Sequence, residues 1–142
     1  MNDGCVAMLM VEDNPGDVVL FREAVACTAL SVQLHVVNNG GDAMAFLRRQ
    51  GKFADATRPD VVVLDLNTPI RSGREVLQDM KADPTLCQIP VMILTTSGVD
   101  QDVVDLYTPG RCRYEVKSAL FRDLAAIVAR IHAFGLSCRQ PS

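Results

Sequence analysis

Several residue types that together suit phosphoryl chemistry follow apolar segments of the chain. They are three carboxylates, one hydroxyl and one ammonium: Glu12, Asp13, Asp65, Thr95 and Lys117. Two like charges about 4 Å apart cost on the order of 4 kcal/mol at an effective dielectric near 20, so three carboxylates at one site need countercharge. A divalent cation with oxygen ligands, for which Mg²⁺ is the natural candidate, and the lysine would supply it. A carboxylate in that setting can attack a phosphoryl group, and a hydroxyl can donate a hydrogen bond to it.

These residues can share one site only if the segments before them are neighbouring parallel strands. Five apolar runs of strand length are present, at residues 6–11, 32–37, 61–64, 91–94 and 112–116. Each is followed by a helix-like stretch, and their spacing of roughly 22 to 30 residues suits a strand, a helix and two connections. The pattern predicts an α/β protein.

Helix signals lie between the predicted strands. Asn14, Pro15 and Asp17 supply an N-cap, a proline at the first helical position and an acid in the first turn, ahead of a helix over 18–29. Further helices are predicted around 43–47, closed by Gly51, and around 75–80, stopped near Pro84. The last two are predicted at 99–107 and 119–134.

The polarity of each strand predicts its place in the sheet. The first, third and fourth runs are apolar at successive positions, as expected when helices cover both faces of a parallel strand. The second and fifth runs alternate apolar and polar residues, so we expect them at the edges. This favours a doubly wound, flavodoxin-like sheet in the order 2-1-3-4-5, in which ligands bind at the carboxyl ends of the strands near the switch between strands one and three.

Composition excludes several other classes of protein. The chain has 142 residues, which is one domain's worth, with a core expected at about 5–134 and a short tail at 135–142. The net charge is −3, aromatic residues make up 5% and Trp is absent, so we expect no direct binding to nucleic acid. No apolar run approaches the roughly 18 residues of a membrane span, and no signal peptide is evident. We therefore expect a cytoplasmic protein without an attached output domain.

The cysteines do not suggest a disulfide framework or a zinc site. There are five, an odd number, and they are scattered singly without a CxxC pair: Cys5, Cys27, Cys87, Cys112 and Cys138. We expect the cysteines to pack as small buried hydrophobic residues, except for one exposed thiol in the tail.

Several stretches together resemble the signature motifs of response-regulator receiver domains. They begin with Val11-Glu12-Asp13-Asn14-Pro15-Gly16-Asp17 and Leu64-Asp65-Leu66-Asn67, and continue with Ile89-Pro90-Val91-Met92-Ile93-Leu94-Thr95 and Tyr114-Glu115-Val116-Lys117. The resemblance spans about residues 5 to 134 and is specific, because the motifs occur in order at receiver spacing. The start of the first motif, the Leu94-Thr95-Thr96-Ser97 run and Lys117-Ser118 are similar to small stand-alone receivers of bacterial phytochrome pathways.

The resemblance implies a role for each residue of the set. Asp65 would be the phosphoacceptor. Mg²⁺, or Mn²⁺, would be bound by the side chains of Asp13 and Asp65, by the backbone carbonyl of Asn67, and by Glu12 through water. Lys117 would contact the phosphoryl group, and Thr95 with Tyr114 would form the switch pair, the ring turning inward on phosphorylation.

The resemblance also implies a signalling protein that is no enzyme beyond its own phosphotransfer and dephosphorylation. The phosphoryl donor would be a sensor histidine kinase, for which a bacteriophytochrome is a candidate, and an unidentified downstream protein would receive the signal. Three residues depart from the usual receiver pattern. Ser118 replaces the proline after the lysine, Thr96 stands where a small residue is common, and Glu115 puts a charge inside the fifth strand.

Other functions and plainer roles for the same residues remain open at this point. Taken singly, each acid could be a helix cap or a solvated strand-end residue. A flavodoxin-like cofactor binder would need a phosphate-cradling loop where Glu12 and Asp13 stand. A hydrolase that forms an acyl phosphate would need a second aspartate where Asn67 stands. A receiver-shaped scaffold that works without phosphorylation is a third alternative.

The last predicted helix is apolar over more than one stripe. One stripe comprises Leu120, Leu124, Ile127, Val128 and Ile131. Outside it lie further apolar residues: Phe121, Ala125, Ala129 and Phe134. A second apolar face predicts a homodimer or another partner on a surface formed by the fourth predicted helix, the fifth strand and this last helix, with Tyr107, Cys112 and Tyr114 nearby. A tightly packed helix in a monomer is the alternative.

Overall fold

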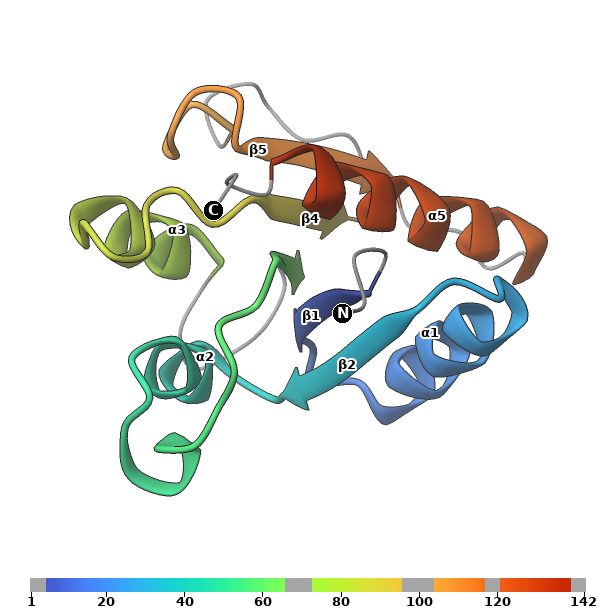
Figure 1. Cartoon of the computed structure of the whole chain (residues 1–142), viewed down its shortest axis with the longest axis horizontal. Helices are drawn as coiled ribbons and strands as arrows, with labels where there is room; N and C mark the ends of the chain where they lie inside the picture. The colour runs from blue at the N-terminus through green and yellow to red at the C-terminus, as the bar shows by residue number, and fades with distance from the viewer. Residues whose placement is uncertain (1–4, 66–72, 96–103, 117–120, 139–142) are drawn as a thin grey trace.

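The computed structural model describes residues 5–65, 73–95, 104–116 and 121–138 of the chain, and it contains five parallel strands. The strands are β1 (Val6–Val11), β2 (Val32–Val37), β3 (Val61–Asp65), β4 (Val91–Thr95) and β5 (Cys112–Val116), shown in Figure 1. They form one sheet in the order β2-β1-β3-β4-β5. The predicted order and both predicted edge strands are confirmed. Every described side chain of β3 and β4 is buried, whereas the β2 and β5 edges are partly wet.

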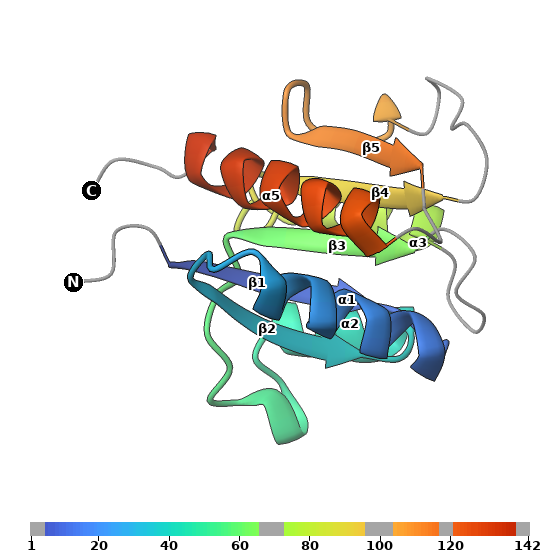
Figure 2. The same ribbon diagram turned by 90° about the vertical axis from the view of Figure 1, so that its right-hand side faces the viewer.

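Helices cover both faces of this sheet. They are α1 (Pro15–Cys27), α2 (Gly40–Leu47), α3 (Gly73–Ala82) and α5 (Phe121–Ser137), with a short 3₁₀ turn η1 at Gly51–Phe53. Figure 2 shows α1 and α5 on one face and α2 and α3 on the other. Gly16 and Gly73 lie in the first turns of their helices, but Gly51 begins the 3₁₀ turn and does not close α2. None of the described helices is long and apolar enough to cross a bilayer.

The C-terminal helix is longer than the sequence predicts. The predicted end at Phe134 is wrong, because α5 continues to Ser137. The reason lies at Gly135, which is buried where the helix crosses the sheet. A Cβ built at this position would lie 3.1 Å from Val6 Cγ1 and 3.4 Å from Val61 Cγ1. Gly135 is thus a close-approach residue inside the helix, not the first residue of a tail.

The predicted fourth helix is only partly covered by the described residues. Residues 99–103 lie outside them. Val104 is helical, and Asp105 to Tyr107 form a turn in which the Tyr107 N–H donates to the Val104 carbonyl at 3.3 Å. The helix therefore ends before Tyr107, three residues short of the predicted boundary.

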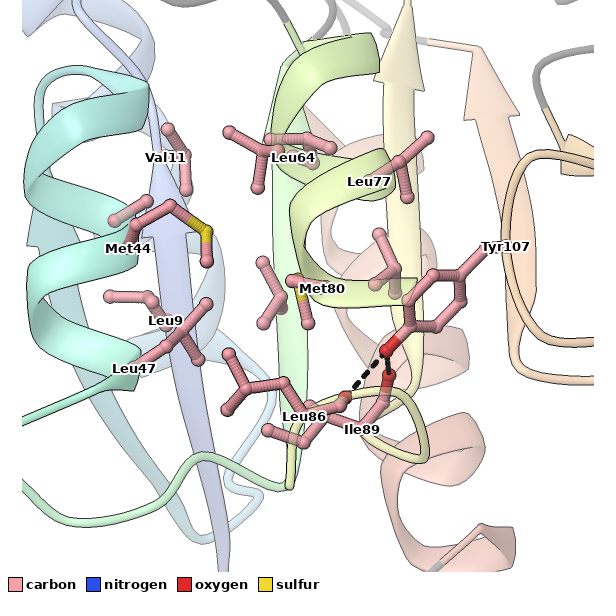
Figure 3. Close-up of a cluster of buried hydrophobic side chains, with 14 of the residues drawn as sticks. Leu9, Val11, Met44, Leu47, Leu64, Leu77, Met80, Leu86, Ile89 and Tyr107 are labelled. Carbon is pink, nitrogen blue, oxygen red and sulfur yellow. Dashed lines mark hydrogen bonds between the residues drawn. The ribbon is translucent and has the colours of Figure 1, made fainter. Parts of the chain in front are cut away.

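Two apolar layers enclose the sheet. One lies beneath α2 and α3 and includes Leu9, Leu64 and Leu77, shown in Figure 3. The other lies beneath α1 and α5 and includes Phe21, Ile131 and Phe134. Burial on both faces explains the continuous apolar runs of the three central strands. The core holds the ends of β1, β3 and β4 at one edge of the sheet.

Tyr107 ties the turn before β5 to the loop before β4. Its ring is buried, and its hydroxyl lies 2.8 Å from the Leu86 carbonyl and 2.6 Å from the Ile89 carbonyl (Figure 3). Burial raises the pKa of the phenol above its usual value, and the nearby Cys87 and Cys112 thiols add to that shift, so the hydroxyl stays a donor at physiological pH.

We expect Tyr107→Phe to lower the free energy of unfolding by about 1–3 kcal/mol, because two buried carbonyls lose their hydroxyl partner. Urea unfolding followed by circular dichroism measures this change. Tyr114→Phe is the matched control, since the Tyr114 side chain is 43% exposed, and we expect a change within about 0.5 kcal/mol for it. Equal stability of Tyr107→Phe and the wild type would show that the hydrogen bonds of the Tyr107 hydroxyl do not stabilise the fold.

All five cysteines are free thiols. The expectation that most are buried is wrong, because only Cys112 is buried while Cys27 is exposed and the others are partly exposed. Burial raises the pKa of the Cys112 thiol to about 12, which keeps it protonated and unreactive.

Candidate functional site

The acidic residues at the ends of β1 and β3 lie at the same edge of the sheet. Val11 of β1 pairs with Leu64 of β3 in the parallel register, so the next residues, Glu12 and Asp65, stand at one level. This edge is the carboxyl edge, at the switch point where the chain order reverses between β1 and β3. The predicted convergence of these acids is confirmed for their backbones.

Glu12 and Asp13 have different surroundings although they are adjacent. Glu12 is 1% exposed, and one of its carboxylate oxygens, Oε1, accepts a hydrogen bond from the Asn14 N–H at 3.1 Å. Its own N–H donates to the Val37 carbonyl at 3.0 Å, which extends the pairing of β1 with β2 by one residue. Asp13 is exposed. The pair thus offers one carboxylate within the fold and one facing solvent.

The start of α1 fixes where Asp13 stands. The Asn14 side chain caps the helix, its Oδ1 accepting from the N–H groups of Gly16 at 2.9 Å and Asp17 at 3.3 Å. Pro15 occupies the first helical position, as predicted. Asp13 is therefore held between a buried strand and a capped helix. The N-terminus of a helix also favours negative charge near it, which suits a site that receives a phosphoryl group.

The remaining predicted residues follow the other strand ends. Asp65 ends β3 and pairs with Leu94, and Thr95 ends β4 and pairs with Val116, which Lys117 follows directly. The side chains of Asp65 and Thr95 lie outside the described part of the structure. So do Asn67, Thr96, Lys117 and Ser118 as whole residues.

The donor set at this edge suits a hard divalent cation. Carboxylates of Glu12, Asp13 and Asp65 are oxygen ligands, and neither histidine is among these residues. Mg²⁺ and Mn²⁺ both prefer such all-oxygen sites and tolerate bound water. A cation held by these residue types would supply the charge neutralisation that phosphoryl transfer to a carboxylate requires.

Glu115, the charged residue inside β5, has a partner that sequence reasoning missed. Its two carboxylate oxygens accept hydrogen bonds from Nε and Nη2 of Arg130 on α5, both at 2.8 Å. These bonds raise the pKa of the arginine. The charge of Glu115, which departs from the usual receiver pattern, is thus compensated by Arg130 on α5.

The predicted partner surface needs correction. Tyr107 and Cys112 are buried, and Phe134 is 1% exposed within the core. The guanidinium of Arg113 lies over the Phe134 ring, 4.6 Å from its centroid. On the described β5–α5 side, the large exposed hydrophobic residues are Tyr114 and Val116. Tyr107, Cys112 and Phe134 therefore lie in the core and not on a partner surface, whereas Leu120 and the side chain of Phe121 lie outside the described part of the structure.

An exposed apolar pair on α1 also escaped sequence reasoning. Val19 is 53% exposed and Leu20 is 39% exposed, one turn into the helix that follows Asp13. The sequence signal for this pair was the run Val18-Val19-Leu20. Three consecutive apolar residues cannot all face the core from one helix, so part of the run must be exposed.

Known proteins match the chain over most of its length. A family model described as response regulator receiver domain matches residues 8–129. Response regulator Rcp1 of Synechocystis is 39% identical over 129 residues, which cover 91% of this chain and 88% of Rcp1. The structure of the phosphorylated cyanobacterial phytochrome response regulator RcpA is 42% identical with a TM-score of 0.80, covering 96% of this chain and 99% of RcpA.

A second solved structure bears on the metal. The Mn²⁺-bound form of Rcp1 has a TM-score of 0.79 and 35% identity, and the match covers 96% of this chain and 99% of that one. Receiver domains bind divalent metal, and their general role is to be phosphorylated by a histidine kinase. With the matching sheet order, the strand-end acids and a family match over residues 8–129, this chain belongs to the response regulator receiver family.

Proposed function

We propose that Asp65 accepts a phosphoryl group from a sensor histidine kinase in a Mg²⁺-dependent reaction in the cytoplasm. The observation that supports the proposal is the register of β1 and β3, which aligns the end of β1, followed by Glu12 and Asp13, with the end of β3 at Asp65, at the switch point of the sheet. An Asp65 oxygen attacks phosphorus, the bond from phosphorus to the imidazole nitrogen of the kinase breaks, and the imidazole takes up a proton. The product is an aspartyl phosphate.

The residues around Asp65 have distinct roles in this proposal. Asp13 and Asp65 bind the cation through their side chains, Asn67 through its carbonyl, and Glu12 through water. When bound, the cation neutralises charge on the phosphoryl oxygens. Lys117, which follows β5, contacts the phosphoryl group, and Thr95 donates a hydrogen bond to it. The oxygen-only donor set supports Mg²⁺, with Mn²⁺ as a substitute.

Reduction and peptide mapping test the identity of the phosphorylated residue. Borohydride converts an aspartyl phosphate to homoserine, so the phosphorylated protein should yield homoserine at position 65. Trypsin should release residues 53–71 as one peptide, because Arg58 precedes a proline. Homoserine at the position of another aspartate would show that this other aspartate, and not Asp65, is the phosphorylated residue.

The output side of the proposal rests on the exposed end of β5. Tyr114 is 43% exposed and Val116 is 48% exposed. Thr95 pairs with Val116, so the β4 end and the β5 edge are coupled through the backbone. We propose that inward rotation of Tyr114 toward Thr95 on phosphorylation reshapes this surface, which then binds a second copy of the chain or a downstream protein.

The proposed kinase class follows from the matching proteins. RcpA is by its title a phytochrome response regulator, and its sequence is 42% identical to this chain. A bacteriophytochrome kinase is therefore the proposed donor.

The exposed pair Val19 and Leu20 supplies a contact surface for that kinase next to Asp13. We expect a variant with both residues changed to serine to receive phosphoryl groups from an autophosphorylated phytochrome kinase at least tenfold more slowly. Fully burying such a side chain is worth about 1.5–3 kcal/mol, and since Val19 and Leu20 are about half exposed, a partner gains about 1 kcal/mol from each. Transfer is measured from radiolabelled kinase in single-turnover assays.

Two controls separate docking from chemistry. Phosphorylation by acetyl phosphate, which needs no docking surface, should be unchanged in the double variant. Leu30→Ser removes a comparably exposed side chain, 36% exposed, from the α1–β2 connection and should leave transfer unchanged. Wild-type transfer rates in the double variant would exclude this face of α1 as the docking surface.

A further inference from the structure

A groove rich in arginine lies at the amino edge of the sheet, opposite the phosphorylation edge. It is lined by Leu47, Arg48, Arg49, Arg58, Thr85 and Leu86. These residues come from the end of α2 and from the connections that precede β3 and β4, so the topology places them at the amino ends of the strands. Leu47 and Leu86, which also line the groove, belong to the apolar core shown in Figure 3.

The groove carries more positive than negative charge. Arg58 donates from Nη1 to the Thr85 carbonyl, which holds its guanidinium in the wall. The Nε of Arg48 lies 3.6 Å from Oδ2 of Asp83. The other carboxylate oxygen of Asp83, Oδ1, already accepts hydrogen bonds from the N–H and the hydroxyl of Thr85. The Arg49 side chain makes no hydrogen bond or ion pair in the part of the chain that the structure describes.

Among the described residues, Arg49 and Arg58 therefore have no carboxylate partner in the groove, although the whole chain has a net charge of −3.

Arg49 occupies a backbone position that normally belongs to glycine. Its φ is +55°, and α2 ends in a Schellman turn in which the Gln50 N–H donates to the Ala45 carbonyl and the Arg49 N–H donates to the Phe46 carbonyl. A side chain in this left-handed conformation is unfavourable. The chain thus keeps a guanidinium in the groove at a position where glycine would suit the backbone better.

We propose that this groove binds the diphosphate group of a small molecule. Guanidinium groups match phosphate oxygens with paired N–H donors. The Arg58 guanidinium is already held in the groove wall by the Thr85 carbonyl, so it loses little freedom on binding. The two uncompensated charges call for a ligand with at least two negative charges, which a diphosphate carries. The groove involves six residues, which is a small-ligand site and not an extended protein interface. The ligand would bind without contacting Asp65, since the two sites lie at opposite ends of the strands.

Calorimetric titration with pyrophosphate and with ADP, in EDTA, tests the proposal. Binding of pyrophosphate and ADP with similar affinity supports a site for the diphosphate group alone, and tighter binding of ADP supports a nucleotide. Arg49→Gly is the decisive variant, because it removes the guanidinium while relieving the backbone. We expect its affinity to fall at least tenfold and its thermal midpoint to stay equal or rise.

Controls define the results that would overturn the proposal. Arg22→Gln removes an exposed arginine on α1, outside the groove, and should leave affinity unchanged. Absence of binding to either probe, an unchanged affinity in Arg49→Gly, or an equal loss in Arg22→Gln would each overturn it. Tighter binding of a hexaglutamate peptide than of either probe would also overturn it, and would assign the groove to an acidic protein segment.

Discussion

Replacing Asp13 with Asn is expected to slow phosphorylation of the protein by acetyl phosphate about 100-fold at limiting Mg²⁺, the typical cost of removing one electrostatic group from a reacting site. Asp13 is exposed between the end of β1 and the N-cap of α1, so the substitution removes charge from the site without removing a buried contact. The cation then binds more weakly beside Asp65, and less of the charge on the phosphoryl oxygens is neutralised.

Phosphorylation rates measured by intact mass over a range of Mg²⁺ concentrations give this result. Asp42→Asn is the matched control, because Asp42, like Asp13, lies near the N-terminus of a helix that follows a strand end. We expect the control to react like the wild type. Wild-type rates and Mg²⁺ dependence in Asp13→Asn would remove Asp13 from the metal site.

Phe134→Ala is expected to lower the free energy of unfolding by about 3–5 kcal/mol, the usual cost of deleting a buried aromatic side chain. The ring lies in the layer beneath α1 and α5 and is covered by the guanidinium of Arg113. For a chain of this size each kcal/mol lowers the thermal midpoint by about 2–4 °C. The loss is therefore large against a total stability of about 5–15 kcal/mol.

Thermal and urea unfolding measure the change, and light scattering shows whether self-association changes with it. Ala129→Ser alters an exposed residue of the same helix and should shift stability by no more than about 0.5 kcal/mol. Unchanged stability of Phe134→Ala combined with altered self-association would instead place Phe134 on a partner surface.

Much of the fold and the placement of the site could be predicted because parallel sheets leave strong local signals. Strands buried on both faces are continuously apolar, and edge strands such as β2 alternate, which together fix the sheet order. The signals for the start of α1, Asn14 at the N-cap and Pro15 at the first helical position, are equally local. Once the order is known, the acids after β1 and β3 must meet at one edge, so the site follows from the strand order and the strand ends.

The periodicity of α5 was misread at one position. Phe134 stands three residues after Ile131 and seven after Ile127, so it continues the buried stripe, and the structure buries its ring. Gly135 could not be placed from periodicity. A glycine after an apolar stretch predicts a helix end, but close packing against Val6 makes glycine the residue that fits within the helix.

Contacts between distant segments were also beyond sequence reasoning. Glu115 and Arg130 are 15 residues apart, and only the packing of α5 beside β5 brings them together. The arginine groove joins Arg49 and Arg58 to the loop before β4, a combination that depends on how three connections meet. Charge pairing of this kind leaves no periodic pattern in the sequence.

The most direct test of the account is intact-mass spectrometry of the wild type and of Asp65→Asn after incubation with acetyl phosphate, with and without Mg²⁺. We expect one phosphoryl adduct on the wild type that requires Mg²⁺, is lost in mild alkali and is absent from Asp65→Asn. An adduct of equal yield on Asp65→Asn, or none on the wild type with either acetyl phosphate or a phosphorylated kinase, would contradict it and favour a scaffold that works without phosphorylation.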